Sequence, residues 1–189
     1  RSSDLHLATR FKEKIGQNVN LLGEVVLGNE EADHRYHHYL EALESPDINY
    51  ISVKISGIYA QTHALNYEES FPELVSRMSA LYQKAIDFPY TDEDGIKRSK
   101  FINLDMEEYK DAHFTLRLFK AVLNLPQFKN YSAGIVVQAY LPDAYDFQTE
   151  LLEFAKARID GGGAPIKMRL VKGCNLEMET VISSLKGWP

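Results

Sequence analysis

Residues 165–175, PIKMRLVKGCN, are the stretch that decides the fold of this chain. The segment 166–171 has strand character, because Ile, Met, Leu and Val dominate it and glycines stand on both sides. A strand this short and apolar is usually covered on both faces, as in a parallel sheet. It nevertheless carries Arg169, and an unpaired arginine is almost never buried. Arg169 is therefore expected either to form a structural ion pair or to face a ligand.

Composition narrows the class of protein. The chain has 189 residues, of which 44% are hydrophobic and 25% charged, as in ordinary globular domains. Its net charge of −6 and the lack of a basic run argue against a nucleic-acid partner. A single cysteine, Cys174, excludes an intrachain disulfide and favours a reducing, cytoplasmic compartment. No apolar run reaches the ~20 residues of a membrane span. Both ends are expected to continue into a longer chain, because the first residue is Arg and no boundary signal closes the last ones.

The segment 166–171 is the fifth of five strand patterns, and each is followed by a helix pattern. The other four strands are expected at 18–27, 49–58, 100–106 and 133–141. The helices are expected from a cap at Asn29 to Glu44, from a cap at Ser70 through Ala85, and over 107–124, 142–158 and 175–186. Strictly alternating strands and helices indicate an α/β fold with a parallel sheet.

Polar residues stand at or near the carboxyl ends of these strands. They are Lys54, Asp105, Gln138, Arg169 and Lys172. In a β/α barrel these ends share one mouth, where active sites are built. A full (βα)8 TIM-type barrel needs about 250 residues and eight units, so this chain is expected to supply the first five units over 18–189, after a boundary segment at 1–17. No G-x-G-x-x-G follows the first strand, which argues against a doubly wound dinucleotide-binding sheet.

Two of these residues have more than one possible role. Lys54 is expected in the centre of an apolar strand, where a lysine is costly unless paired or used. It could form an ion pair, act as a Schiff-base nucleophile, or bind an anionic substrate. Asp105 ends its strand directly before a predicted helix, so it could belong to a site or simply cap that helix.

Three histidines lie on the first predicted helix. His34 and His38 are four residues apart and share a face, as metal-binding pairs can, whereas His37 lies beside them. No third ligand is indicated by the spacing, so a solvated histidine-rich surface is favoured over a metal site.

Six segments together resemble the proline dehydrogenase domain, especially as found in bifunctional bacterial proline utilization A. They are LLGE (21–24), ISVKIS (51–56), INLDMEEY (102–109), VVQAYLPD (136–143), RLVKG (169–173) and the helix sequence at 175–189. The resemblance runs from about Asn18 to Pro189, with the motifs in order on the expected strands. It implies a distorted (βα)8 barrel that holds FAD, oxidises L-proline to Δ1-pyrroline-5-carboxylate by hydride transfer to flavin N5, and passes electrons to a quinone.

The resemblance also implies roles for single residues. Lys54 matches the residue that binds the proline carboxylate, and Asp105 the acidic residue that orients its polar neighbours. Arg169 matches the arginine beside flavin N5. The other positions matching flavin contacts are Met106, Gln138, Val171, Lys172, Gly173 and Cys174. A fused or partner aldehyde dehydrogenase domain and peripheral contact of the parent protein with the inner membrane are also compatible with it.

The chain departs from the family pattern in two ways. Cys174 stands where many members carry alanine. The arginine pair and tyrosine that complete the family's proline site fall beyond Pro189, so the 189-residue chain alone is expected to be inactive. Two other functions stay open: an aldolase-type lyase that uses Lys54 as a Schiff base, and a non-catalytic barrel scaffold.

Overall fold

A five-stranded parallel sheet forms the centre of the computed structural model. The structure describes residues 9–10, 13, 15, 17–20, 28–59, 67–173 and 175–187. The strands are β1 (Val19–Asn20), β2 (Tyr50–Lys54), β5 (Phe101–Asp105), β6 (Gly134–Gln138) and β7 (Lys167–Val171). They lie in the order β1-β2-β5-β6-β7, and every neighbouring pair is parallel.

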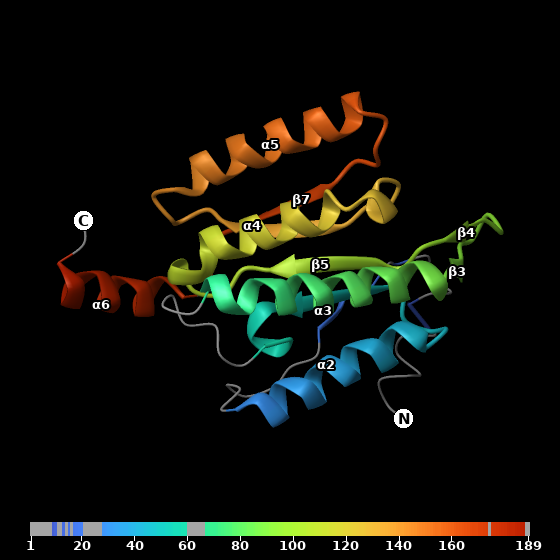
Figure 1. The fold of residues 1–189 in the computed structure, drawn as a ribbon, viewed down its shortest axis with the longest axis horizontal. Helices are drawn as coiled ribbons and strands as arrows, with labels where there is room; N and C mark the ends of the chain where they lie inside the picture. The colour runs from blue at the N-terminus through green and yellow to red at the C-terminus, as the bar shows by residue number, and fades with distance from the viewer. Residues whose placement is uncertain are drawn as a thin grey trace.

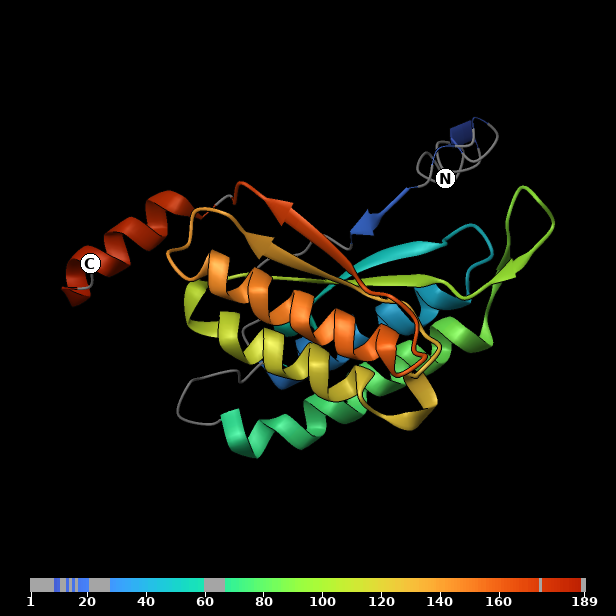
Figure 2. The same ribbon diagram turned by 90° about the horizontal axis from the view of Figure 1, so that it is seen from above.

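Four long helices cover the same face of this sheet (Figures 1 and 2). They are α2 (Asn29–Glu44), α3 (Tyr67–Asp87), α4 (Ala112–Leu123) and α5 (Ala144–Asp160). Within this sheet, strands that follow one another in sequence are neighbours in space, with no reversal of order. A doubly wound sheet would reverse its strand order and carry helices on both faces. Sequential order with one-sided helices is the arrangement of a β/α barrel, and the expected α/β barrel architecture is confirmed for these five units.

Side-chain alternation along the strands separates the core from the site. Apolar residues at alternate positions, such as Ile51 and Val53 on β2 and Ile102 and Leu104 on β5, are fully buried in the core that includes the helices. The intervening positions carry polar groups. They include Ser52, Lys54, Asn103, Asp105, Gln138 and Arg169. In a closed barrel this second face becomes the interior.

Several predicted boundaries are wrong by a few residues. Lys54 ends β2 rather than lying at its centre, because the chain turns into a 3₁₀ helix at Ile55–Gly57. Helix α3 begins at Tyr67, so Ser70 is not its cap and Pro72 lies inside it. Gly28, not Asn29, is the N-cap of α2.

The helix expected from residue 107 begins later. A 3₁₀ turn at Tyr109–Asp111 precedes α4, which starts at Ala112. Asp105 is therefore not a helix cap, and residues 106–108 form an irregular connection at the sheet edge.

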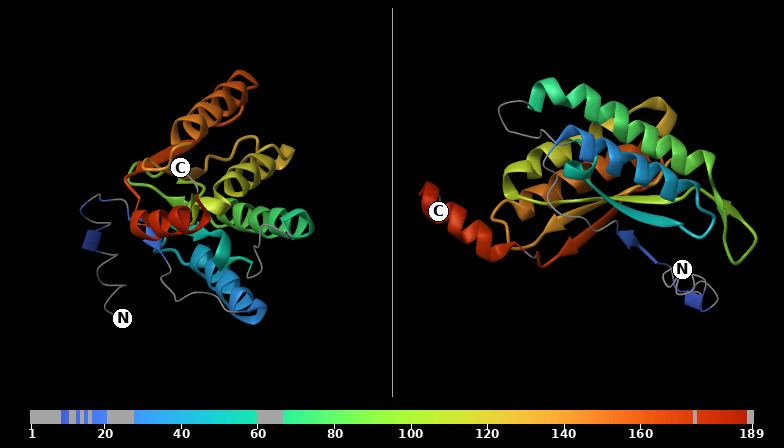
Figure 3. Two further views of the ribbon diagram at one scale, coloured as in Figure 1. Left: turned by 90° about the vertical axis from the view of Figure 1, so that its left-hand side faces the viewer. Right: turned by 90° about the horizontal axis from the view of Figure 1, so that it is seen from below.

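Strand β7 is an edge strand, and its surroundings are open. Its neighbour on one side is β6, and among the described strands it has none on the other. Its residues are half-buried or exposed, contrary to the expected two-sided cover, because no described element packs beyond it. Helix α6 (Leu176–Lys186) follows and extends beyond the carboxyl end of the sheet, whereas the hairpin of β3 (Tyr90–Thr91) and β4 (Lys97–Arg98) lies at the opposite end (Figure 3).

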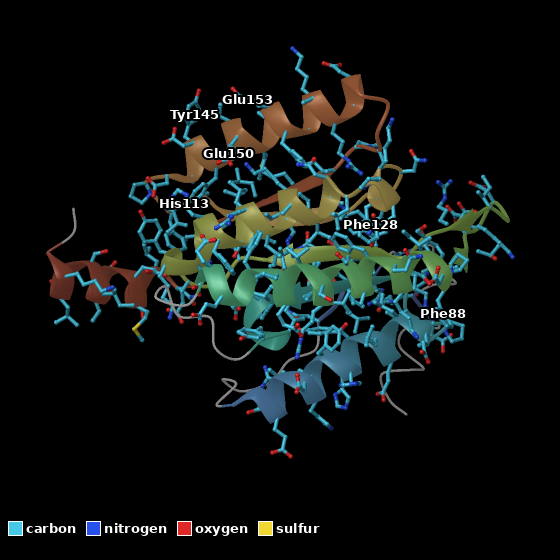
Figure 4. All side chains as sticks on the ribbon, viewed as in Figure 1. Phe88, His113, Phe128, Tyr145, Glu150 and Glu153 are labelled. Carbon is cyan, nitrogen blue, oxygen red and sulfur yellow. The ribbon has the colours of Figure 1, made fainter. Side chains whose placement is uncertain are left out.

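Helix α5 has one side toward solvent and another toward α4. Tyr145 and Glu153 project from the outer side of α5, whereas Glu150 lies toward α4, where it pairs with Lys120 (Figure 4). Within the described part of the chain, no helix has the length and apolar character needed to cross a membrane.

Candidate active site

The candidate site lies where β2, β5, β6 and β7 end. Lys54 and Asp105 are register partners at the ends of β2 and β5. Gln138 and Val171 are partners at the ends of β6 and β7. Arg169, two residues before Val171, points to the same face of the sheet. The structure thus brings together side chains that are far apart in the sequence.

The centre of the site is an ion pair between Asp105 and Arg169. Nη2 of Arg169 donates to Oδ1 of Asp105 over 2.7 Å. The same oxygen accepts hydrogen bonds from Asn103 Nδ2 at 2.7 Å and from Ser52 Oγ at 3.3 Å. Burial raises the pKa of the Asp105 carboxyl above its ordinary value, and Arg169 is the strongest of the neighbours that oppose this shift. The first alternative for Arg169, an ion pair, is confirmed, and the pair lies inside the candidate site.

Lys54 faces the open side of this site. Its ammonium is 3.9 Å from Oε1 of Glu107, and its side chain is 40% exposed. Glu107 is held from its other side, because Ser56 donates to it from both Oγ (2.9 Å) and the backbone N–H (3.2 Å). Lys54 therefore has a loose anionic neighbour and remains accessible to a ligand.

Two polar side chains on the neighbouring strands β6 and β7 each keep an atom without a partner among the described residues. Gln138 is buried and uses its amide nitrogen to donate to the Glu107 carbonyl at 3.0 Å, next to Met106. Its Oε1 and the Nε of Arg169 are buried, and within the described part of the chain neither has a hydrogen-bond partner. Buried polar atoms are nearly always satisfied, so one unused acceptor and one unused donor on adjacent strands indicate a polar ligand.

The loop after β7 has a glycine that no other residue could replace. Gly173 has a φ of +98°, and a Cβ built on it would lie 1.7 Å from Cε1 of Tyr140. Tyr140 follows β6, so this contact fixes the loop with Lys172 against the next loop of the mouth. Close approach of backbone to side chain, together with positive φ, requires glycine here.

Neighbouring loops are tied together above the sheet. The Tyr109 hydroxyl donates to Asp143, and the Tyr109 backbone N–H donates to Oε1 of Glu179 on α6 at 2.8 Å. These three residues and Tyr140 contribute to the lining of a cavity of about 680 Å³ between the β6–α5 loop and α6. These contacts therefore hold the loops at the carboxyl ends of β5, β6 and β7 in place.

Some of the predicted residues cannot be placed. Cys174 and the segment 21–27, with its LLGE motif and Glu24, lie outside the described residues.

The histidine pair that was considered as a metal site lies on α2. The rings of His34 and His38 are 4.2 Å apart. Among the described residues, no cluster of three or more His, Cys, Asp or Glu side chains could hold a metal ion.

Three residues of the site were not predicted from the sequence: Ser52, Asn103 and Glu107. The signal for the first two was present, because each stands two positions before a predicted site residue and so shares its face of the strand. Glu107 gave no such signal, since its position depends on an irregular connection where a helix was expected.

Comparisons with known proteins agree on one family. A family model described as proline dehydrogenase matches residues 5–189. Proline utilization A from Corynebacterium freiburgense is 41% identical with a TM-score of 0.90, over 100% of this chain and 19% of that chain. The protein from Bdellovibrio bacteriovorus, in a structure described as inactivated by N-propargylglycine, is 31% identical with a TM-score of 0.82, over 98% and 20% of the two chains.

A more distant structure shares the fold alone. Proline utilization A from Bradyrhizobium japonicum is 24% identical with a TM-score of 0.75, over 90% of this chain and 17% of that chain. No curated protein sequence matches. The chain spans about a fifth of the length of these structural relatives.

Proposed function

The chain belongs to the proline dehydrogenase family, and from this premise we propose that it supplies one side of an FAD-dependent active site that oxidises L-proline to Δ1-pyrroline-5-carboxylate. The observation that carries the proposal is the ion pair of the buried Asp105 with Arg169, beside an accessible Lys54 at one sheet edge. The activity belongs to the full-length protein that contains this chain.

The unused polar atoms of the site fit a flavin. The isoalloxazine ring offers acceptors at N5 and its carbonyl oxygens and a donor at N3. Arg169 Nε is an unused donor and Gln138 Oε1 an unused acceptor, so the two could hold complementary edges of such a ring. The residues we propose to line the cofactor site are Met106, Gln138, Arg169, Val171, Lys172, Gly173 and Cys174.

When bound, FAD supplies the hydride acceptor for the oxidation of proline at C5. Arg169 places a fixed positive charge in the site, which favours the electron-rich reduced state of a neighbouring ring. Asp105 holds Arg169 through the 2.7 Å contact and thereby keeps its guanidinium from rotating. The protein's own contribution is thus orientation and charge.

Lys54 is the proposed partner of the proline carboxylate. A carboxylate substrate needs a cation, and a charge-assisted contact also gives orientation. Lys54 is exposed enough to receive a ligand, and its only ion-pair partner in the described residues, Glu107, is 3.9 Å away. Substrate binding can therefore replace a weak contact by a closer one.

The remaining partners are also proposals. We expect a quinone as the electron acceptor, an aldehyde dehydrogenase domain that consumes the product, and a cytoplasmic protein with peripheral membrane contact. Nothing favours the lyase or scaffold alternatives, since the matched relatives are proline utilization A proteins.

The decisive experiment is anaerobic spectroscopy of the full-length protein. It should be yellow, with stoichiometric FAD, and L-proline should bleach the flavin band. Borohydride with substrate should leave Lys54 unmodified. Absence of bound flavin, or flavin that proline does not reduce, would refute the proposal, and a borohydride-trapped adduct on Lys54 would favour the lyase.

A further inference from the structure

A chain of hydrogen bonds crosses the sheet beneath the Asp105–Arg169 pair. Asn18, directly before β1, donates from Nδ2 to Ser52 Oγ on β2 at 2.7 Å. Ser52 donates in turn to Oδ1 of Asp105 on β5, which also binds Arg169 on β7. Asn103, on β5 like Asp105, donates to the same oxygen. Side chains of three strands, β2, β5 and β7, thus converge on one carboxylate oxygen, and Asn18 beside β1 holds one of them, Ser52.

Asn103 is held in place by the packing around it. It is fully buried, and it lies beside Gly134, its register partner on β6. A Cβ on Gly134 would lie 2.6 Å from Asn103 Oδ1 and 2.9 Å from the ring of Phe101. The glycine therefore leaves the space that the Asn103 amide occupies. The amide can then present its nitrogen to Asp105.

All three donors contact the same one of the two carboxylate oxygens of Asp105. In the described part of the chain, every hydrogen bond to the Asp105 carboxylate goes to Oδ1. A carboxylate bound through one oxygen by one arginine nitrogen could rotate and lose its geometry. Donors from Ser52 on the neighbouring strand β2 and from Asn103 on β5 itself remove that freedom, since each holds the same oxygen from a different position.

We propose that Asn103 and Ser52 are positioning residues for the flavin-facing arginine, acting through Asp105. They fix Oδ1 as the acceptor for Arg169 Nη2, so that Arg169 Nε stays directed away from the pair and free for the ligand. The proposal rests on the proposed function for its catalytic consequence. Its geometric part concerns only residues of this chain.

The two donors also govern the charge of Asp105. A hydrogen bond to a carboxylate favours the charged form, so losing one raises the pKa of Asp105 further above its ordinary value. A protonated Asp105 would no longer hold Arg169 as an ion pair. The charged or titratable groups that face this carboxyl from the neighbouring elements are Lys54, Arg169, Glu107, Tyr39 and Tyr50.

The test uses Asn103→Leu and Ser52→Ala in the full-length protein, with Ser52→Thr as the conservative variant. Thr115→Val is the matched control, because Thr115 is equally buried and donates to the carbonyl of Asp111, the residue directly before its own helix. The rate of flavin reduction by proline is measured against pH. The acid limb should move up by about 0.5–1 pH unit in Asn103→Leu, by less in Ser52→Ala, whose bond is longer, and not in Ser52→Thr or Thr115→Val.

Two further measurements do not depend on turnover. Crystal structures of the variants should show the Arg169–Asp105 contact lengthened or lost. The loss of melting temperature caused by Asn103→Leu should largely disappear in an Asp105→Asn background, because the two residues act as one unit.

Each outcome decides a different claim. A lowered melting temperature with an unchanged pH profile and an unchanged Arg169–Asp105 contact would overturn the positioning role and leave a structural one. If wild-type flavin were not reduced by proline, the proposed function would fail. The crystal structures and the Asp105→Asn background would then still decide the positioning role.

Discussion

Lys54 and Asp105 lie opposite each other at the ends of two adjacent parallel strands, β2 and β5. Their side chains emerge on the same face of the sheet, yet Asp105 pairs with Arg169 two strands away, whereas Lys54 lies 3.9 Å from Glu107. The carboxylate at the centre of the site therefore does not neutralise the lysine closest to it in register. This separation leaves one cation held by a close ion pair with the buried Asp105 and another with only a loose anionic neighbour, as a site with a cofactor and an anionic substrate requires.

Replacing Lys54 by alanine should weaken substrate binding. A charge-assisted contact contributes roughly 1.5–3 kcal/mol, so the affinity for proline or for tetrahydrofuroate should fall at least tenfold. The FAD content should change little. Calorimetry or a spectral titration of the full-length protein measures the affinity. Lys110→Ala is the control, because Lys110 pairs with Glu108 and has no proposed substrate contact. Unchanged analogue affinity in Lys54→Ala would refute the assignment.

Replacing Arg169 by methionine should lower the flavin reduction potential and slow its reduction by proline. The reason is that a fixed positive charge beside the ring stabilises its reduced form. Lys167→Met is the matched control, since Lys167 lies on the same strand and face but two residues earlier, over the rings of Tyr50 and Phe101. Anaerobic spectroelectrochemistry and stopped-flow absorbance measure the two effects. A potential equal to wild type would leave Arg169 with a structural role only.

The sequence predicted the architecture well because the periodicity of buried strands is strong. The order of strands and helices and the parallel pairing both followed from where apolar runs and glycines stand. Arg169 and Asp105 could each be predicted as candidate site residues, because each is a charged residue in or at the end of an apolar strand. That they form one pair could not be read from the sequence, since it depends on the register of β5, β6 and β7.

The failures lie at the ends of elements. Lys54 was expected at a strand centre because Ile55 and Ile58 continue the apolar run, but both residues are buried in the 3₁₀ turn and beyond it instead. The late start of α4 likewise moved Glu107 from a helix into the site. Local propensity does not define such boundaries when tertiary packing supplies the burial.

Replacing Gly173 by alanine should abolish stoichiometric FAD binding. The new Cβ would collide with the Tyr140 ring. The alanine would also have to adopt a φ of +98°, which an L-residue rarely tolerates. Gly95→Ala separates the two effects, because Gly95 has a φ of +78° with open space around it. Flavin absorbance per protein after gel filtration is the measurement. A Gly173→Ala protein with full flavin content would show that the loop position is unimportant for the cofactor.

Replacing Arg158 by methionine should lower stability more than any surface arginine. Arg158 donates to the carbonyl oxygens of five residues: Leu123, Phe128, Lys129, Tyr131 and Ala164. These groups end α4 and lead into β6 and β7, so their loss should cost about 2–4 kcal/mol. Arg158→Lys should recover only part of this, because an ammonium lacks the guanidinium fork. Thermal unfolding measures the effect, and Arg117→Met, at an exposed pair with Glu68, should change little. Equal melting temperatures for the two methionine variants would contradict this reading.

The 189-residue chain expressed by itself should bind FAD weakly or not at all and should not oxidise proline. Five units do not close a barrel that needs eight, and β7 is the open edge that carries Arg169. Leu170 on this edge is half exposed, and the apolar residues of α6 are uncovered, with Leu185 82% exposed. An open parallel edge beside uncovered apolar side chains invites pairing with other copies. We therefore expect association or poor solubility on gel filtration, with little flavin absorbance in any fraction. A longer version that includes the downstream part of the barrel should be yellow and should reduce a dye with proline in the same assay. Stoichiometric FAD and normal turnover from residues 1–189 would show that the side chains described here form a sufficient site on their own.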